Sequence, residues 1–280
     1  MSELNFTVRQ FIEAAYEKLL LRPIDSFGVE HWGNALLNDP RRASEFLDAL
    51  LGGQEFTNMC GRFLQSYVAP ERIPFITDNS QFGELKILLG EMISRSVRHK
   101  IVIDCGAYGR DCSNSYDLMR HFGWRGLLIE PSSSRIEIIR REFAGLDYDL
   151  VPVAAASYTG TATLHIGAAD GVSSIHRGVT EAVTPIVNTL EVAAERLPDI
   201  LERHKIPKDF GLLSIDAEGE GHNLLNDAVA SGYRPTWVII EVFEGLNVKT
   251  LDDQPLSDEV KASCRIVGRT FPNLILEVLP

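Results

Sequence analysis

Two short apolar runs, each ending in an acidic residue, constrain this chain more than any other feature. Residues 101–103 (Ile-Val-Ile) lead to Asp104 and a turn through Gly106, and residues 127–129 (Leu-Leu-Ile) lead to Glu130. Uninterrupted apolar runs of this length are typical of strands buried on both faces of a parallel sheet. An acid at the end of the second strand is the usual acceptor for the ribose hydroxyls of a nucleoside cofactor. The pattern therefore predicts an α/β domain that binds such a cofactor.

The turn after the first run distinguishes between cofactors. A dinucleotide site carries the motif G-x-G-x-x-G, whose second and third glycines let a diphosphate approach backbone amides. Counted from Gly106, those two positions hold Tyr108 and Asp111, a ring and a carboxylate that would obstruct and repel a diphosphate. S-adenosylmethionine has a ribose but no phosphate, and its sulfonium is cationic. The turn therefore favours S-adenosylmethionine over NAD.

Charge and composition exclude several classes of partner. The 280 residues carry a formal net charge of −12, which argues against binding to nucleic acid or to an anionic membrane. The N-terminus lacks the pattern of a secretory signal, and no apolar run reaches the roughly 18 residues of a membrane span. The four cysteines lack metal-ligand spacing. We expect a cytoplasmic protein with reduced thiols.

Residues 1–68 are predicted to form a small helical bundle. Apolar residues recur at helical spacing in four stretches, near 11–20, 29–36, 46–51 and 56–64. Residues 69–80 contain turn formers and little periodicity, and we interpret them as a linker. The bundle is expected to serve in docking or solubility, without chemistry of its own.

Residues 81–280 are predicted to form one doubly wound, mostly parallel α/β domain. Helices are expected to alternate with strands near 101–105, 126–130, 149–153, 212–216 and 237–242. Two further strands, near 264–269 and 273–278, are joined by so short a connection that they must pair antiparallel. Residues 161–166 alternate in polarity, which predicts a strand in an insertion after the third strand.

The turn after the first strand supplies candidates for the donor site. Gly106 and Gly109 lack the Cβ atoms that would collide with a ligand lying over the turn. Asp104 can accept a hydrogen bond from the methionyl ammonium of the donor. Ser113, at the start of the next helix, either caps that helix or contacts the ligand. The predicted donor site is completed by Ala107, Glu130, Pro131, Ser132 and Asp216.

A second group of polar residues follows the fourth strand. Asp216 ends that strand at the edge where ligands bind in such sheets. Glu218 and His222 are four residues apart, so we expect them on one face of a helix. Together the three could deprotonate an acceptor hydroxyl or hold a divalent cation. The alternative is that the acids only favour a helix N-terminus and His222 is solvated. Glu241, which ends the fifth strand, is either an active-site member or tied to a buried donor.

Several segments in order resemble the FkbM family of S-adenosylmethionine-dependent methyltransferases. They are Val102–Ala107 (VIDCGA), Ser113–Ser115 (SNS), Phe122–Pro131 (FGWRGLLIEP), Leu213–Gly219 (LSIDAEG), Pro235–Glu241 and Asn273. This resemblance extends over about residues 100–278. It implies a Rossmann-like methyltransferase fold and O-methylation, commonly of sugars or natural-product hydroxyls. The segment from Tyr16 to Phe56 separately resembles a helical domain family of uncharacterised function that often accompanies bacterial surface-glycan enzymes.

We therefore expect an S-adenosylmethionine-dependent methyltransferase that acts on a hydroxyl of a sugar, glycan or natural product. The alternative is a non-catalytic scaffold, in which the bundle docks a glycan-assembly partner and the sheet is vestigial. A vestigial site has no reason to retain Asp104, Glu130 and Asp216 together. A methyltransferase should bind the donor and a scaffold should not, so donor binding distinguishes the two functions.

Overall fold

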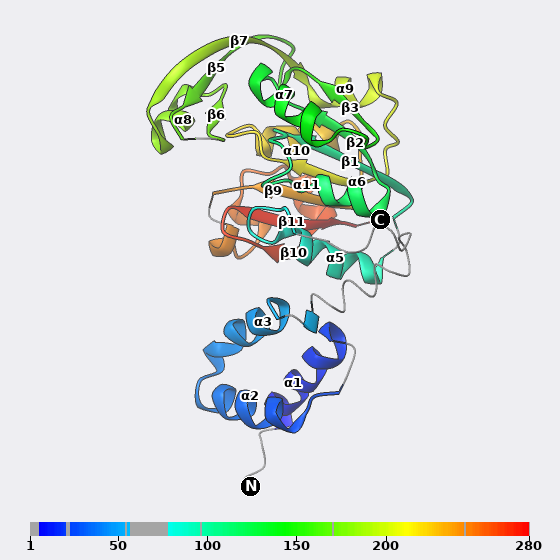
Figure 1. Cartoon of the computed structure of the whole chain (residues 1–280), viewed down its shortest axis with the longest axis vertical. Coiled ribbons are helices and arrows are strands. Elements are labelled where there is room, and N and C mark those ends of the chain that lie inside the picture. The colour runs from blue at the N-terminus through cyan, green and yellow to red at the C-terminus, as the bar shows by residue number, and fades with distance from the viewer. Residues whose placement is uncertain are drawn as a thin grey trace. The chain divides into compact units, whose positions relative to one another are not determined.

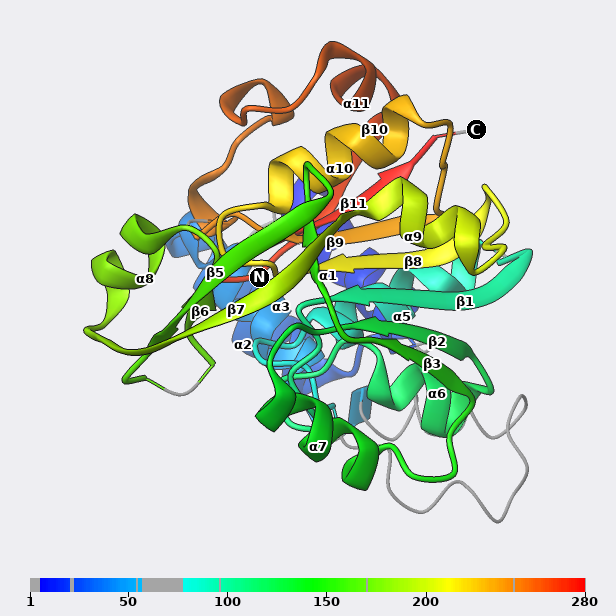
Figure 2. The same cartoon turned by 90° about the horizontal axis from the view of Figure 1, so that it is seen from above.

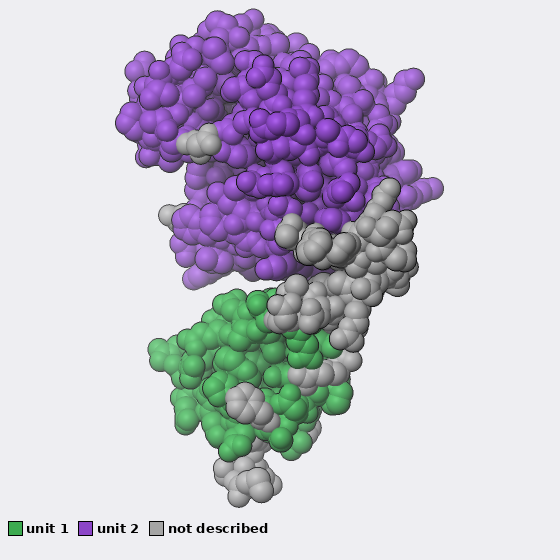
Figure 3. Space-filling model, in the orientation of Figure 1, with its two compact units in different colours: residues 1–76 green, residues 77–280 purple. Residues whose placement is uncertain are grey.

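The structure is a computed structural model that describes residues 6–20, 23–53, 55–56, 78–95, 97–169, 171–243 and 245–279. The chain divides into two compact units, Met1–Ile76 and Thr77–Pro280 (Figure 3). The predicted helix near 56–64 and most of the predicted linker at 69–80 lie outside the described residues. In the described part of the chain, no helix combines the length and the apolar character that a membrane span requires.

The first unit is helical. Its described elements are α1 (Phe6–Leu19), α2 (Ser26–Asn38), a short 3₁₀ helix (Pro40–Arg42) and α3 (Ala43–Leu51). Phe46 is fully buried and packs against the rings of Tyr16 and Trp32, with ring centroids 6.3 and 5.2 Å away. Gly28 lies where α2 meets α1, because a Cβ there would come within 2.7 Å of the Tyr16 hydroxyl. The apolar stripes of the sequence thus form one core of this unit.

The second unit is built on a seven-stranded sheet in the order β10-β11-β9-β8-β1-β2-β3. The neighbours from β9 to β3 pair in parallel, whereas β11 pairs antiparallel with both β9 and β10. Both predictions, the parallel strands and the terminal hairpin, are confirmed. The strands are β1 (His99–Cys105), β2 (Arg125–Ile129), β3 (Tyr148–Val151), β8 (Phe210–Ile215), β9 (Trp237–Glu241), β10 (Cys264–Arg269) and β11 (Asn273–Val278).

Helices cover both faces of this sheet (Figure 1). Val102 packs into one core with residues of α5 (Glu84–Ser94), α6 (Tyr116–Phe122) and α7 (Ser133–Glu142). Its neighbour Ile103 packs into the other, with residues of α9 (Leu197–Arg203), α10 (Gly221–Ala230) and α11 (Asp258–Ser263). Successive strand residues point to opposite faces, so a strand buried on both sides must be apolar throughout. This is why residues 101–103 and 127–129 contain no polar residue before the acid that follows each run.

A second, four-stranded sheet follows β3 (Figure 2). The strand predicted at 161–166 is confirmed as β5 (Gly160–Gly167). The other three strands and the helix between them were not predicted: β4 (Ala154–Ala156), β6 (Ser173–Ser174), α8 (Arg177–Val183) and β7 (Ile186–Arg196). The order is β4-β7-β5-β6, and β5 and β7 form a long antiparallel pair. We call residues 154–196 the insertion; it lies beside the carboxyl ends of the main strands and supplies one wall of the site described below.

Candidate active site

The carboxyl ends of β1 and β8 meet at Gly106. A Cβ at this position would lie 1.9 Å from the carbonyl oxygen of Asp216, which is far inside a van der Waals contact. The φ of Gly106 is +88°, a backbone conformation that glycine adopts without steric cost. The amide of Asp216 donates a hydrogen bond to the carbonyl of Cys105, 2.9 Å away. Glycine at 106 therefore lets the two strand ends, and the acids on them, approach each other.

Asp104 ends β1 as a buried carboxylate. It accepts a hydrogen bond from the Ser115 hydroxyl at 2.5 Å, and burial raises its pKa to about 6. Ser113 lies in the turn that leads into α6, where its hydroxyl oxygen accepts hydrogen bonds from the amides of Ser115 and Tyr116. The N-cap position of α6 is Ser115, so Ser113 shapes the turn before the helix and does not cap it, and its contact with a ligand stays a prediction.

Glu130 follows β2 and is also buried. Its Oε1 accepts a hydrogen bond from the Ser132 amide, 2.7 Å away, and burial raises its pKa to about 7. Within the described residues, its second carboxylate oxygen makes no hydrogen bond. A buried carboxyl with an open acceptor atom is suited to bind hydroxyl donors.

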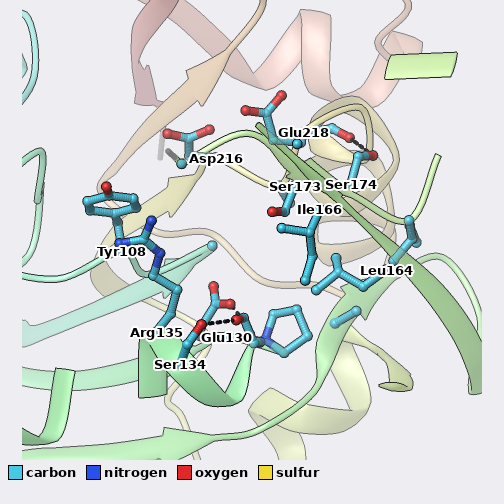
Figure 4. A pocket seen from close by; sticks show the side chains of 18 of the residues that line it. Tyr108, Glu130, Ser134, Arg135, Leu164, Ile166, Ser173, Ser174, Asp216 and Glu218 are labelled. Atoms are coloured by element: carbon cyan, nitrogen blue, oxygen red, sulfur yellow. Dashed lines mark hydrogen bonds between the residues drawn. The ribbon is translucent and has the colours of Figure 1, made fainter. Parts of the chain in front are cut away.

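Glu130 lies on one wall of a cavity of about 260 Å³. Figure 4 shows Glu130 on one side of this cavity and Asp216 and Glu218 on the opposite side. Polar and apolar side chains both line the walls between them, and the apolar ones come from three segments: Pro131 after β2, Ala154 and Ala155 of β4, and Leu164 and Ile166 of β5. The Arg135 guanidinium lies 3.8 Å from the centre of the Tyr108 ring at the cavity wall. We call this space the first cavity.

A second cavity, of about 440 Å³, adjoins the first. The two share Gly106, Tyr108, Gly171, Asp216 and Glu218 as lining residues. The second cavity adds two more carboxylates, Asp104 and Glu241, and a set of other residues that includes Ser113, Asn114, Phe82, Phe243 and Phe271. Asp216 and Glu218 thus stand where the two cavities meet.

Asp216, Glu218 and Glu241 form a cluster, which we call the acid trio. One carboxylate oxygen from each lies within 4.8 Å of the others. Burial, followed by the nearby charges of Asp216 and Glu218, raises the pKa of Glu241 to about 9. The Asp216 side chain opens onto the cavities, yet enough protein surrounds it that desolvation raises its pKa, opposed by a hydrogen bond with Glu241. The proton of this pair therefore resides on Glu241, whose carboxyl group donates a hydrogen bond to the Asp216 carboxylate.

Glu218 has one carboxylate oxygen without a hydrogen-bond partner among the described residues. Its Oε2 is buried and makes no hydrogen bond to the described residues. Burial, and then the charge of Asp216, raise the Glu218 pKa to about 7. A carboxyl that exchanges its proton near neutral pH is suited to general base catalysis.

The predicted helical pairing of Glu218 with His222 is wrong. Glu218 and Gly219 have φ of +36° and +100°, so the chain turns through left-handed backbone and α10 begins only at Gly221. The His222 ring is 3.0 Å from the Gln254 side-chain oxygen and lines neither cavity. Its place beside Asp216 and Glu218 is taken by Glu241, one of the two roles that the sequence left open for that residue.

The predicted donor-site residues divide between the two cavities. Those at the first cavity are Gly106, Glu130, Pro131, Ser132 and Asp216, and those at the second include Asp104 and Ser113. Ala107 is buried in the core beneath the turn, and Gly109 packs near Glu142 of α7. These last two shape the turn and line neither cavity.

The insertion is hydrogen-bonded to the loop after β8 that carries Asp216 and Glu218, which sequence reasoning missed. The Ser174 hydroxyl donates a hydrogen bond to the Glu218 carbonyl at 2.6 Å. The buried Glu220 carboxylate lies 2.6 Å from the His176 ring nitrogen and accepts a hydrogen bond from the Ser157 amide at 3.2 Å. These partners are more than forty positions apart in sequence, so no local pattern marks them. The contacts hold Glu218 in its turn.

Comparisons with known proteins identify two segments of the chain. The family model described as the methyltransferase FkbM domain matches residues 104–252. A domain of unknown function, DUF4214, matches residues 2–60, in agreement with the resemblance seen in the helical N-terminal segment. Neither a curated protein nor a solved structure matches the chain.

Proposed function

Because the chain belongs to the FkbM methyltransferase family, we propose that it transfers the methyl group of S-adenosylmethionine to a hydroxyl of a sugar, glycan or natural product. The family makes the chain a methyltransferase and implies S-adenosylmethionine as its cofactor. The acceptor, the roles of individual residues and the division of the chain below are our proposals.

The donor fits the first cavity through Glu130. One Glu130 oxygen is held by the Ser132 amide, which leaves the other open to the ribose hydroxyls. The apolar side chains of Ala154, Leu164 and Ile166 offer the adenine a dry wall. Asp104, near the end of β1 and at the second cavity, suits the methionyl ammonium of the donor, so that the methionyl end would extend from the first cavity into the second. When bound there, S-adenosylmethionine supplies an electrophilic methyl group.

The acceptor occupies the second cavity in this proposal, with its hydroxyl at the acid trio. Glu218 accepts the hydrogen bond of the hydroxyl and takes its proton as the new C–O bond forms and the methyl–sulfur bond breaks, which leaves S-adenosylhomocysteine. Asp216, which accepts from Glu241, lies beside Glu218 and orients the acceptor through a neighbouring donor group. Much of the acceleration would come from alignment, since positioning two reactants can remove roughly 7–11 kcal/mol of the barrier. His222, the auxiliary base suggested by the sequence, has no part in this scheme.

A divalent cation held by the acid trio is the alternative to proton transfer through it. Carboxylate oxygens are the ligands that magnesium and calcium prefer, and the three side chains are close enough to share one ion. A chelator separates the two schemes. Activity that persists after dialysis against EDTA supports proton transfer, whereas activity that is lost and then restored by magnesium supports the cation.

The N-terminal segment is proposed to be a separate unit. We assign residues 1–68 to a helical bundle, 69–80 to a linker and 81–280 to the methyltransferase domain. The DUF4214 match to residues 2–60 and the compact unit at Met1–Ile76 support a separate helical unit, to which we assign a role in docking a protein partner.

The observation that carries the proposal is the pair of adjoining cavities with Glu130 on one side and Asp216 and Glu218 where the cavities meet. Calorimetry of the purified protein with S-adenosylmethionine, S-adenosylhomocysteine and NAD tests it. We expect binding of both adenosyl ligands and none of NAD, and mass spectrometry of methylated products to show a gain of one methyl group. Tight NAD binding without a response to either adenosyl ligand would overturn the proposal. So would the absence of binding to any of the three ligands, which is the result expected of a non-catalytic scaffold.

A further inference from the structure

Three phenylalanines stand exposed at the mouth of the second cavity. Phe82, Phe243 and Phe271 are 45%, 45% and 61% exposed and all line this cavity. They come from separate segments: the residues before α5, the residues after β9, and the connection between β10 and β11. The rings of Phe82 and Phe271 are 5.9 Å apart, centroid to centroid. Large aromatic side chains gathered in the open around one cavity indicate a surface for binding.

A buried carboxylate ties together the two backbone segments that carry Phe82 and Phe271. Glu84, at the start of α5, has no solvent exposure. It accepts hydrogen bonds from the Phe82 amide at 2.9 Å, the Thr270 hydroxyl at 2.6 Å and the Asn273 side-chain amide at 2.8 Å. The Phe82 backbone, Thr270 and Asn273 are thus all hydrogen-bonded to the Glu84 carboxylate.

The third ring belongs to a segment attached to the same connection. The amides of Val242 and Gly245, on either side of Phe243, donate to the carbonyls of Pro272 and Phe271 at 2.7 and 2.9 Å. We call Phe82, Phe243 and Phe271, held in this way, the aromatic rim. Because these hydrogen bonds fix the backbone that carries the rim, a ligand would not have to order that backbone on binding.

The floor of the same cavity carries only one kind of charge. Asp104, Asp216, Glu218 and Glu241 line it, and no lysine, arginine or histidine is among its described lining residues. A phosphate or carboxylate would be repelled by these carboxylates and would find no cationic side chain among the described residues that line the cavity. Hydroxyl groups, by contrast, donate to carboxylates and need no countercharge.

We propose that the acceptor presents an uncharged sugar ring to this cavity, its apolar C–H face against the aromatic rim and its hydroxyls toward the acid trio. A sugar ring is the acceptor type in our proposed function that has one apolar face and several hydroxyl donors together. Sugars that carry a phosphate close to the ring, including nucleoside diphosphate sugars, are excluded from the site. The inference rests on the proposed methyl transfer and narrows its acceptor.

Competition between charged and uncharged sugars tests the choice of acceptor. The full chain, with S-adenosylmethionine, is given methyl glycosides of glucose, galactose, mannose and rhamnose, and in parallel the corresponding nucleoside diphosphate sugars. We expect methylation of at least one methyl glycoside, with kcat/KM at least about tenfold above that of its nucleotide-linked counterpart. Preference for a nucleotide-linked sugar over the neutral glycosides would overturn the proposal.

Variants of the rim test its role. Phe271→Ala should raise KM for the preferred glycoside by roughly tenfold, the loss of one stacked apolar face, with kcat little changed. Phe271→Trp should restore KM, because a ring is retained. Tyr158→Ala is the matched control, since Tyr158 is an aromatic residue 43% exposed that lines neither cavity. An unchanged KM in Phe271→Ala would remove the rim from acceptor binding.

Donor binding separates a failure of this inference from a failure of the proposed function. Phe271→Ala should bind S-adenosylhomocysteine as the parent does, because Phe271 does not line the first cavity. A parent protein that binds the donor and methylates only anionic acceptors contradicts the inference alone. A parent that binds neither adenosyl ligand contradicts the proposed function itself.

Discussion

The two cavities lie side by side and share five residues, yet their chemistry differs. The first has Glu130 on one wall, with an amide partner and an arginine nearby, and Asp216 and Glu218 on the opposite wall, with apolar and polar side chains between them. The second collects four carboxylates beneath three exposed phenylalanines. One buried acid with a free acceptor atom suits a ligand that must be held. Several acids that raise each other's pKa suit a ligand whose proton must be moved.

The comparison also shows how one fold supports both tasks. Glu130 and Asp216 occupy equivalent positions, just beyond the carboxyl ends of parallel strands β2 and β8. What distinguishes them is the neighbouring chain: Glu241 from β9 lies beside Asp216, and left-handed backbone turns Glu218 toward it. The difference between the cavities therefore arises from their loops and not from the sheet.

The largest effect should come from breaking the point where the cavities meet. Gly106→Ala places a Cβ against the Asp216 carbonyl and forces alanine into left-handed backbone. We expect a loss of about 3–5 kcal/mol in the free energy of unfolding, and loss of both donor binding and turnover. Denaturant unfolding and calorimetry with S-adenosylhomocysteine measure these effects.

Gly232→Ala is the matched control for that variant. Gly232 also has positive φ, +81°, but a Cβ there meets no atom within 4 Å. It should cost only the backbone term, about 1–2 kcal/mol, and leave both cavities intact. Equal losses in the two variants would show that the close approach at Gly106 is unimportant.

The next effect should divide the two cavities. Glu218→Gln removes the proposed base while keeping its size, and should lower kcat by about 10²–10⁴ with donor affinity unchanged. Asp216→Asn should also lower kcat strongly, since it removes the carboxylate that orients the acceptor. The exposed Glu137 of α7, which lines neither cavity, provides Glu137→Gln as the control. Full activity in both active-site variants would move the chemistry elsewhere on the rim of the sheet.

The shared proton of the second cavity should appear as a pH dependence of stability. The Glu241 pKa is about 9 in the folded protein against an ordinary value of 4.5. Between these two pH values the folded state keeps a proton that the unfolded state has released. Stability should therefore fall as pH rises through this window. Glu241→Gln should remove that loss, so that its thermal midpoint gains on the parent progressively from pH 5 to pH 9. A constant difference across this range would contradict the assignment.

The smallest effect should come from the helical unit. A chain without residues 1–68 should bind S-adenosylhomocysteine within about threefold of the full chain, because the methyltransferase family model matches only residues 104–252. Circular dichroism establishes that the shortened chain is folded. A folded, shortened chain with much weaker donor binding would mean that the bundle completes the site.

The strand ends could be predicted because their burial on both faces leaves a plain pattern in the sequence. Ile101-Val102-Ile103 must be apolar at every position, and the acid that follows therefore marks the sheet edge. The terminal hairpin could be predicted as well, because only a few residues separate its two strands. Most of the insertion was not: β7 is largely exposed or half-buried along its length, so neither an apolar run nor a clean alternation identifies it.

The acid trio could be predicted only in part, for a reason of backbone geometry. The sequence places Glu218 and His222 four apart, which favours a shared helix face. Positive φ at Glu218 and Gly219 breaks that spacing, and nothing in the local sequence requires a non-glycine residue to adopt it. Contacts from the insertion hold this turn, and their partners, Ser174 and His176, are remote in sequence. Long-range contacts of this kind leave no periodicity to detect.

The affinity of the protein for S-adenosylhomocysteine, measured by calorimetry in three variants, tests the division between the two cavities most directly. Glu130→Ala should weaken binding at least roughly tenfold, because charge-assisted hydrogen bonds contribute about 1.5–3 kcal/mol each. Glu218→Gln and the control Glu137→Ala should bind within about twofold of the parent. Unchanged affinity in a folded Glu130→Ala protein, or a larger loss in Glu218→Gln, would contradict the assignment of donor and acceptor to the first and second cavities.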